Sequence, residues 1–176
     1  MKKNLIAIAV LAASALTTHV ATAANGTVNF TGKIIPDGCD VTTSTKNLNV
    51  PMDTVAVNAF DGAGSSPAAG SKTFELHLEN CPASITAAAI SFDGISATGD
   101  DTVLALTDGP NTATGVGIQI SDAKGKVVPL HQPSSSYDLT STGINVLKFV
   151  ARYYAVAATV TDGDANAVTN FTIVYP

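Results

Sequence analysis

Hydrophobic and polar residues alternate along much of the chain with a period of two residues, the pattern of a β-strand with one buried face. In the stretch GTVNFTGKII, residues 26–35, one side of the strand consists of Val28, Phe30, Gly32 and Ile34. The closing stretch NFTIVYP repeats the alternation with Phe171, Ile173 and Tyr175. The pattern therefore predicts a two-faced strand near each end of the chain.

Period-two segments also fill the middle of the chain, and helical periodicity is scarce. Strands are predicted at KTFELHL (72–78), AAISFDG (88–94), TVLALT (102–107), GVGIQIS (115–121), KVVPL (126–130) and INVLKFVARYYAVA (144–157). In the longest strand, the residues predicted to face a core are Leu147, Phe149, Ala151, Tyr153 and Ala155. The segment NLNVPMDTVAV (47–57) also looks extended, but Pro51 cannot donate to a ladder, which predicts an edge strand or a bent strand.

The strands are short and the segments between them are rich in Gly, Asp, Asn and Ser, the residues that form turns. About eight such strands without tryptophan predict an all-β fold, an antiparallel sandwich of immunoglobulin-like topology. A jelly roll is the main alternative. The stretch DGAGSSPAAGS (61–71) is predicted to be a loop from its composition.

Residues 1–23, MKKNLIAIAVLAASALTTHVATA, have the features of an export signal. Two lysines precede an apolar run from Leu5 to Leu16, and Ala21 and Ala23 form the A-x-A arrangement that a signal peptidase accepts. The run is too short for a membrane span, which needs about 20 residues. We therefore expect export, and a mature chain of 153 of the 176 residues is long enough for one domain.

The mature chain is acidic, because removal of Lys2 and Lys3 with the signal changes the formal net charge from −5 to −7. Binding to nucleic acids depends on basic patches, so the charge argues against a nucleic-acid partner. The chain has two cysteines, Cys39 and Cys81, and an even number in an oxidising compartment predicts one disulfide. Closing this loop would stabilise the fold by about 4 kcal/mol in the chain-entropy model.

Residues that could carry catalysis or bind a metal do not form a persuasive site. No catalytic triad motif surrounds His77 or His131. His77 and Glu79 could lie on one face of a strand and bind a metal, but a solvated strand face is the favoured interpretation. The aspartate pairs Asp100/Asp101 and Asp162/Asp164 lie in predicted turns, where aspartate caps backbone amides. We therefore predict no enzyme activity, no cofactor and no metal.

One other group resembles a ligand site. A sugar could stack against the adjacent residues Arg152, Tyr153 and Tyr154. However, a strand of a sandwich commonly places one aromatic side chain in the core and the next one on the outer face, and this is the favoured interpretation. Three N-x-[ST] sequons occur, at Asn25, Asn29 and Asn170. Because they lie in or beside predicted strands, they are interpreted as ordinary strand residues and not as glycosylation sites.

The order of several motifs resembles the pilin subunits of chaperone–usher (type 1-like) fimbriae. These motifs are the signal peptide followed by G-x-V-x-F-x-G-x-I-I, the cysteine at Cys39, the strand FELHLENC ending at Cys81, the segment ARYYA, and the closing F-T-I-V-Y. The similarity spans essentially the whole mature chain and is strongest to the major fimbrillins of enterobacterial G fimbriae.

The resemblance implies an immunoglobulin-like sandwich that lacks its last strand, with residues 24–36 as a donor-strand extension and residues 37–176 as the pilin domain. Val28, Phe30 and Ile34 would enter a neighbour's groove, and Gly32 would match the donor-strand glycine. Phe171, Ile173 and Tyr175 would line the acceptor edge. The implied partners are other pilin subunits in a homopolymer, a periplasmic chaperone and an outer-membrane usher, and the implied location is a fimbria on the bacterial surface.

The sequence itself agrees with an open edge, because no charged side chain protects residues 168–176 from pairing with another strand. Pro176 departs from the family, in which a polar residue with an amide donor commonly ends the chain, and this leaves the contact with the chaperone at that end undefined.

Three functions remain open at this stage. The first is a structural pilin, major or minor. The second is a carbohydrate-binding adhesin or minor tip subunit, although tip adhesins are about twice as long because a lectin domain precedes their pilin domain. The third is a self-contained secreted enzyme or inhibitor, which lacks an identifiable catalytic group.

Overall fold

The computed structural model describes residues 26–35 and 37–176. The predicted signal peptide, residues 1–23, lies outside these ranges. Residue contacts divide the chain after Ile34 into two compact units. We call residues 26–34 the leading segment and Ile35–Pro176 the sandwich unit, and we describe each by itself.

The leading segment forms no helix and no strand. Its large apolar side chains are exposed, with relative accessibilities of 76% for Val28, 93% for Phe30 and 98% for Ile34. The predicted strand is thus absent here, because a strand is stabilised by a ladder to a neighbour and by burial of one face. The alternation of apolar and polar residues in the leading segment therefore forms a strand only when a neighbouring strand pairs with it.

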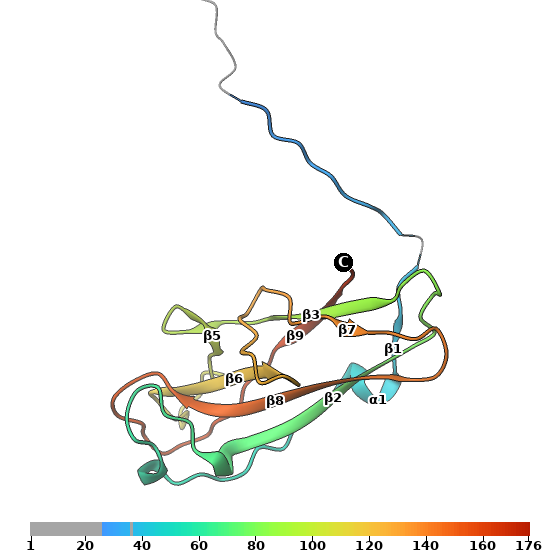
Figure 1. The fold of residues 1–176 in the computed structure, drawn as a ribbon. Coiled ribbons are helices and arrows are strands. Elements are labelled where there is room, and N and C mark those ends of the chain that lie inside the picture. Colours follow the sequence, from blue (N-terminus) through green and yellow to red (C-terminus); the bar gives the residue numbers. More distant parts are fainter. Residues whose placement is uncertain (1–25, 36) are drawn as a thin grey trace, which may run out of the picture. The chain divides into compact units, whose positions relative to one another are not determined.

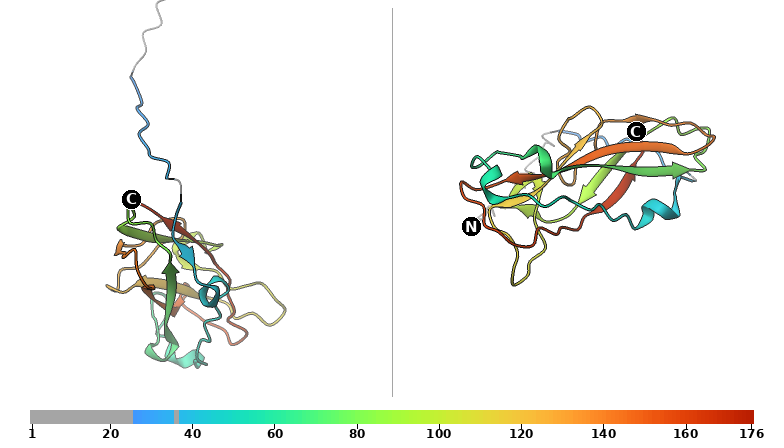
Figure 2. Two further views of the ribbon diagram at one scale, coloured as in Figure 1. Left: turned by 90° about the vertical axis from the view of Figure 1, so that its right-hand side faces the viewer. Right: turned by 90° about the horizontal axis from the view of Figure 1, so that it is seen from below.

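The sandwich unit consists of two antiparallel sheets (Figure 1). The six-stranded sheet has the order β1 (Asp40–Val41), β2 (Ser71–Glu79), β8 (Asn145–Ala155), β6 (Val116–Asp122), β5 (Asp100–Leu104) and β4 (Ser96–Ala97). The three-stranded sheet has the order β7 (Tyr137–Asp138), β3 (Ala87–Asp93) and β9 (Asn170–Val174). Figure 2 shows the same layers from two further directions.

Helix is confined to short turns in the part of the chain that the structure describes. These are α1 (Thr43–Lys46) and the 3-10 turns Val57–Ala59 and Ala68–Gly70. None of these helices has the length and hydrophobicity that a membrane span requires. The prediction of an all-β chain is confirmed.

The core lies between the sheets and contains the side chains that the alternation predicted. The inward residues of β8 are all 8% exposed or less, and they are Leu147, Phe149, Ala151, Tyr153 and Ala155. Phe149 lies 5.6 Å from Phe74 of β2 and 5.2 Å from Phe92 of β3 between ring centroids. The contact between Phe149 and Phe92 joins the two sheets across the core, whereas Phe149 and Phe74 lie on neighbouring strands of one sheet.

Two further predicted strands are wrong. Residues 126–130 make only an isolated bridge between Ser121 and Val127, because the chain turns there and Pro129 has no amide hydrogen to donate. Residues 47–57 form neither an edge strand nor a bent strand, although residues 48–56 lie in an extended stretch free of helix. In contrast, residues 61–71 are a loop as predicted, apart from a 3-10 turn and the first residue of β2.

Candidate functional site

A groove of about 970 Å³ opens onto the core of the sandwich unit. We call it the core groove. One wall is the segment 46–52, and the other is the segment 165–171, which leads into β9. The floor is formed by side chains of both sheets, namely Phe74, Leu76, Phe92, Leu104, Ile118, Ile120, Ala151 and Tyr153.

The floor of the core groove is the hydrophobic core itself, because its residues belong to the buried cluster between the sheets, apart from Phe74, which is partly buried and packs against that cluster. Apolar surface that faces water costs about 25 cal/mol for each Å², so an apolar segment seated in this groove would be stabilised. The groove therefore favours a binding partner that is elongated and apolar on one face.

The β9 wall of the core groove can accept such a partner through its backbone. β9 pairs with β3 in the register Phe92 with Phe171 and Ile90 with Ile173. Within residues 26–35 and 37–176, β9 is an edge strand with a partner on its β3 side alone. An edge strand directs alternate amide and carbonyl groups away from its sheet, ready to bond another strand.

The three residues predicted for this edge occupy different places. Phe171 lines the core groove. Ile173 and Tyr175 are half-buried and pack against the core, but they lie beyond the lining of the groove. Residues of the segment before β9 that sequence analysis did not identify, Ala165 and Ala167, line the groove instead.

The opposite wall, 46–52, was also missed as part of a site. Its apolar residues Leu48, Val50 and Met52 follow each other at a spacing of two and line the core groove. In the described chain, no backbone hydrogen bond joins residues 47–55 to another strand. The period-two spacing was a usable signal, but Pro51 obscured the role of the segment.

A second cavity, of about 330 Å³, continues the core groove at one end, and we call it the end pocket. It shares Met52, Tyr153 and Ala165 with the groove. Apolar residues such as Val55 and Phe60 line it, and its polar lining includes Asp53, Asp162 and Asp164. Burial raises the pKa of the Tyr153 phenol, and the negative charge of Asp53 raises it further.

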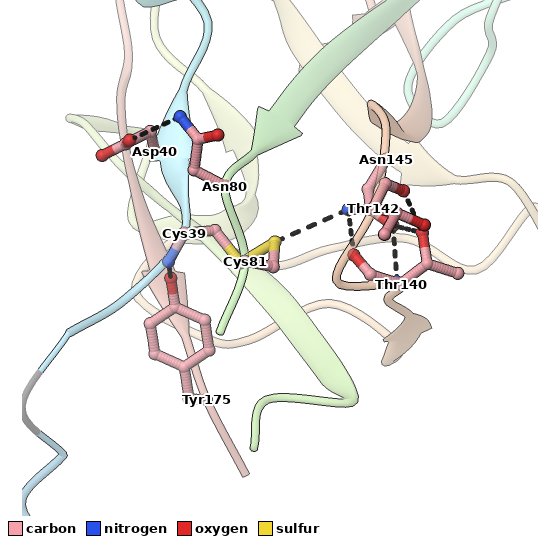
Figure 3. Close-up of a disulfide and its surroundings, with 8 residues drawn as sticks. All are labelled: Cys39, Asp40, Asn80, Cys81, Thr140, Thr142, Asn145 and Tyr175. Carbon is pink, nitrogen blue, oxygen red and sulfur yellow. Dashed lines mark hydrogen bonds between the residues drawn. A yellow bond between two sulfur atoms is a disulfide. The ribbon is translucent and has the colours of Figure 1, made fainter. Parts of the chain in front are cut away.

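Near the other end of β9, Tyr175 is bonded to the start of the sandwich unit (Figure 3). Its hydroxyl accepts a hydrogen bond of 2.7 Å from the backbone amide of Cys39. A Cβ atom at Gly38 would lie 2.7 Å from the same hydroxyl, so the close approach requires glycine. The contact fixes the C-terminal end of β9 against residues 38 and 39.

The disulfide between Cys39 and Cys81 strengthens the same corner, as Figure 3 shows. Asn80 donates a hydrogen bond of 3.0 Å to Asp40, and Asn145 donates one of 3.5 Å to the sulfur of Cys81. The start of the sandwich unit is therefore joined covalently and by hydrogen bonds to the end of β2 and the start of β8.

The other polar candidates have structural roles. His77 contacts Glu75 at 3.2 Å, and the hydrogen bonds from His77 and Lys148 lower the pKa of the Glu75 carboxyl. In residues 26–35 and 37–176, no group of three His, Cys, Asp or Glu residues is arranged to hold a metal. Asp100 and Asp101 were predicted to lie in a turn, but they are the first two residues of β5, directly after the turn at 98–99. Asp100 accepts hydrogen bonds from the hydroxyl and the amide of Thr102, which lower its pKa.

The residues considered as a sugar platform point in different directions. Arg152 donates two hydrogen bonds, of 3.0 and 2.6 Å, to the side chain of Gln119. Tyr153 is 8% exposed and faces the core, whereas its neighbour Tyr154 alternates to the outer face of the sheet. The two tyrosines therefore do not form one stacking surface.

Comparison with known proteins agrees with the open groove. The family described as "Fimbrial protein" matches residues 28–176. Long polar fimbria protein A of Salmonella typhimurium (strain LT2) is 35% identical over 176 residues, which are 99% of this chain and 97% of the relative. The type-1 fimbrial protein subunit of Serratia marcescens is 38% identical over 184 residues, which are 99% of each chain.

The crystal structure of a type I fimbria protein of Burkholderia pseudomallei is similar with a TM-score of 0.60 and 35% identity, covering 85% of this chain and 97% of that one. The incomplete immunoglobulin-like class is confirmed by this likeness to pilins. The full-length match to fimbrial subunits favours a structural subunit over a tip adhesin. The open core, the single disulfide and these relatives lead to one conclusion: the chain belongs to the fimbrial protein family, as a structural pilin.

Proposed function

We propose that this fimbrial subunit polymerises by donor-strand exchange, in which residues 24–36 of one copy fill the core groove of the next. The observation that carries the proposal is the core groove, an apolar furrow bordered by the free edge of β9. The leading segment offers the matching shape, with Val28, Phe30 and Ile34 exposed at a spacing of two or four residues. Addition of a strand to a sheet edge is a known mode of peptide recognition, and chaperone–pilin complementation is one of its standard examples.

The fit is supported by dimensions and by energy. The segment from Val28 to Ile34 spans about 20 Å as a strand, at about 3.3 Å for each residue. Burial of a large apolar side chain contributes about 1.5 to 3 kcal/mol, and three such side chains with a main-chain ladder favour a tight joint before ordering costs are subtracted. Gly32 suits a shallow part of the groove, where a side chain would clash.

The same physical argument calls for a chaperone before assembly. An exposed apolar groove beside a free strand edge promotes aggregation, so a periplasmic chaperone would cover it until an outer-membrane usher brings the next subunit. The product would be a homopolymeric fimbria on the cell surface that supports adhesion without catalysis.

A synthetic peptide of residues 24–35 tests the proposal. When the mature chain is refolded with this peptide, the melting temperature is expected to rise with peptide concentration, because the peptide binds the folded state. A peptide with Phe30→Ala should bind about tenfold more weakly or worse, since about 1.4 kcal/mol of lost burial corresponds to a factor of ten.

The matched control is a peptide with Thr31→Ala, because Thr31 lies on the opposite side of the strand and should bind as the unmodified peptide does. In cells, deletion of residues 24–35 should leave chaperone binding intact and abolish fibre growth. Donor-strand exchange would be refuted if the melting temperature did not change with peptide concentration. It would also be refuted if the Phe30→Ala peptide bound as tightly as the unmodified peptide.

A further inference from the structure

The core groove and the end pocket differ in charge from one end to the other. At the end near α1, the charged residue in the lining is Lys46. At the opposite end, the charged residues in the lining of the end pocket are Asp53, Asp162 and Asp164. A segment that enters the groove therefore meets positive charge at one end and negative charge at the other.

The three aspartates are not equivalent. Asp53 is already paired with Lys72 at 2.9 Å. Asp162 and Asp164 are both exposed, and within the described residues neither carboxylate forms an ion pair. The two negative charges of Asp162 and Asp164 in the lining of the end pocket therefore have no ion-pair partner within the described residues.

The backbone at Gly163 and Asp164 is held in place by hydrogen bonds and close packing. The amide of Asp164 donates to the carbonyl of Asn111 at 2.7 Å, and the carbonyl of Asp164 accepts from Ala113 at 3.0 Å. Gly163, with φ of 148°, has no room for a Cβ atom, which would lie 2.4 Å from the carbonyl oxygen of Asn111. The backbone from which the two carboxylates extend is therefore fixed at residues 163 and 164 before a partner arrives.

The leading segment carries one charged residue, Lys33, beside its last exposed apolar side chain, Ile34. If Ile34 of an incoming copy entered the end pocket, Lys33 would point out of the groove, because neighbouring strand residues face opposite sides. The long lysine side chain would then lie at the rim that carries Asp162 and Asp164. The reverse direction of entry would bring Lys33 towards Lys46.

We propose that Lys33 of the incoming leading segment pairs with Asp162 and Asp164 of the receiving subunit, and that this charge pair selects the direction and speeds the entry of the donor strand. The inference rests on the proposed donor-strand exchange and adds a specificity-determining contact to it. An exposed ion pair contributes little to equilibrium affinity, whereas complementary charge mainly raises the association rate and depends on salt.

The test measures the association rate of fluorescent peptides of residues 24–35 with the refolded mature chain. At about 10 mM salt, where charges act over about 30 Å, the Lys33→Glu peptide should associate about tenfold more slowly than the unmodified peptide. At about 1 M salt, where the range is about 3 Å, the two rates should approach each other. The subunit variant Asp162→Asn/Asp164→Asn should show the same loss with the unmodified peptide.

A charge exchange makes the test specific. The subunit Asp162→Lys/Asp164→Lys should favour the Lys33→Glu peptide over the unmodified one. The neutral asparagine variant serves if the lysine variant misfolds, and Asp138→Asn is the matched control, because Asp138 is an exposed aspartate of β7 outside both cavities. Acetylation of the peptide amino terminus should leave the salt dependence unchanged.

The outcomes separate this inference from the proposed function. Equal rates for the Lys33→Glu and unmodified peptides, with binding still lost on Phe30→Ala, would overturn the charge pair and leave donor-strand exchange standing. A salt dependence that disappears on acetylation would show the opposite direction of entry and would also overturn it. Absence of any Phe30-dependent binding would refute donor-strand exchange itself.

Discussion

The hydroxyl of Tyr175 joins two parts of the sandwich unit that lie 136 residues apart in sequence, through its hydrogen bond with the amide of Cys39. The ring also packs over Gly38, where any side chain would clash with it. Because Tyr175 follows β9, this one side chain positions the end of the strand that borders the core groove. A residue predicted to line the acceptor edge thus has a second, structural role.

We expect Tyr175→Phe to lower the free energy of unfolding of the peptide-filled subunit by about 1 kcal/mol, because the half-buried amide of Cys39 loses its acceptor. Chemical denaturation of the two proteins measures the difference. Tyr154→Phe is the matched control, since no side-chain hydrogen bond of Tyr154 is found within the described residues, and its stability should not change. Equal stability of Tyr175→Phe and the unmodified chain would show that water replaces the lost partner.

At the scale of the element, β6 and the turn after it depend on a buried carboxylate. All seven residues of β6 are buried, and Asp122 at its end is 2% exposed. One oxygen of Asp122 accepts hydrogen bonds of 2.9 and 3.0 Å from the amides of Lys124 and Lys126. Burial raises the pKa of this carboxyl, but the hydrogen bonds that it accepts, including those from these two amides, outweigh the burial and lower the pKa below its ordinary value of 3.8.

The lowered pKa predicts how Asp122→Asn affects stability at different pH. The unfolded chain binds its proton near pH 3.8, above the pKa of the folded state, so ionised Asp122 stabilises the fold above pH 3.8 and the gain disappears as the pH falls through the lower, folded value. At pH 7 the substitution should cost roughly 1 kcal/mol, since a charged acceptor is exchanged for a neutral one. Below the folded pKa the two proteins should approach equal stability.

Urea denaturation across this pH range checks the prediction. Asp138→Asn, at an exposed position of β7, provides a control for the loss of one negative charge. A difference between Asp122→Asn and the unmodified chain that stays constant down to acid pH would contradict the proposed role of the charge.

Long strands were predictable from the sequence because each has enough residues to display its period. β8 shows this over eleven residues, and β2 over nine. The strands β1, β4 and β7 have two residues each, too few for any period, and their pairing depends on the strands beside them. The segment 126–130 was predicted to be a strand and is not one. Its valines and leucine have a suitable spacing, but the chain turns there and Pro129 cannot donate a hydrogen bond.

At the scale of the whole molecule, the core groove was only partly predictable. The uncharged alternation of residues 168–176 pointed to an open strand edge, and Phe171 of that edge lines the core groove, whereas Ile173 and Tyr175 do not. The wall 46–52 shows a period-two spacing in the sequence, but no local pattern encodes which segments the folded chain brings beside it to form the groove and the end pocket. The same holds for the unpaired aspartates, which read in sequence as ordinary turn residues.

The disulfide should contribute a large part of the stability of this unit. Cys39 and Cys81 are separated by 42 residues. Cross-linking a loop of that length stabilises a fold by about 4 kcal/mol in the chain-entropy model. We expect Cys39→Ala/Cys81→Ala to melt at a clearly lower temperature than the unmodified chain, both alone and when filled by the peptide of residues 24–35.

Thermal unfolding followed by circular dichroism measures the change, and the reducing agent dithiothreitol added to the unmodified chain provides an independent comparison. Both treatments should lower the melting temperature by similar amounts. An unchanged melting temperature in the double variant would show that the corner is held by its hydrogen bonds alone.

The corner formed by Tyr175, Cys39 and Cys81 has a mechanical consequence for a fimbria built in the proposed way. When such a fibre is stretched, tension reaches each subunit through residue 37 and leaves through the strand seated beside β9. Cys39 passes the load to β2 through its disulfide and to the end of β9 through Tyr175, so the force crosses the subunit by a short path.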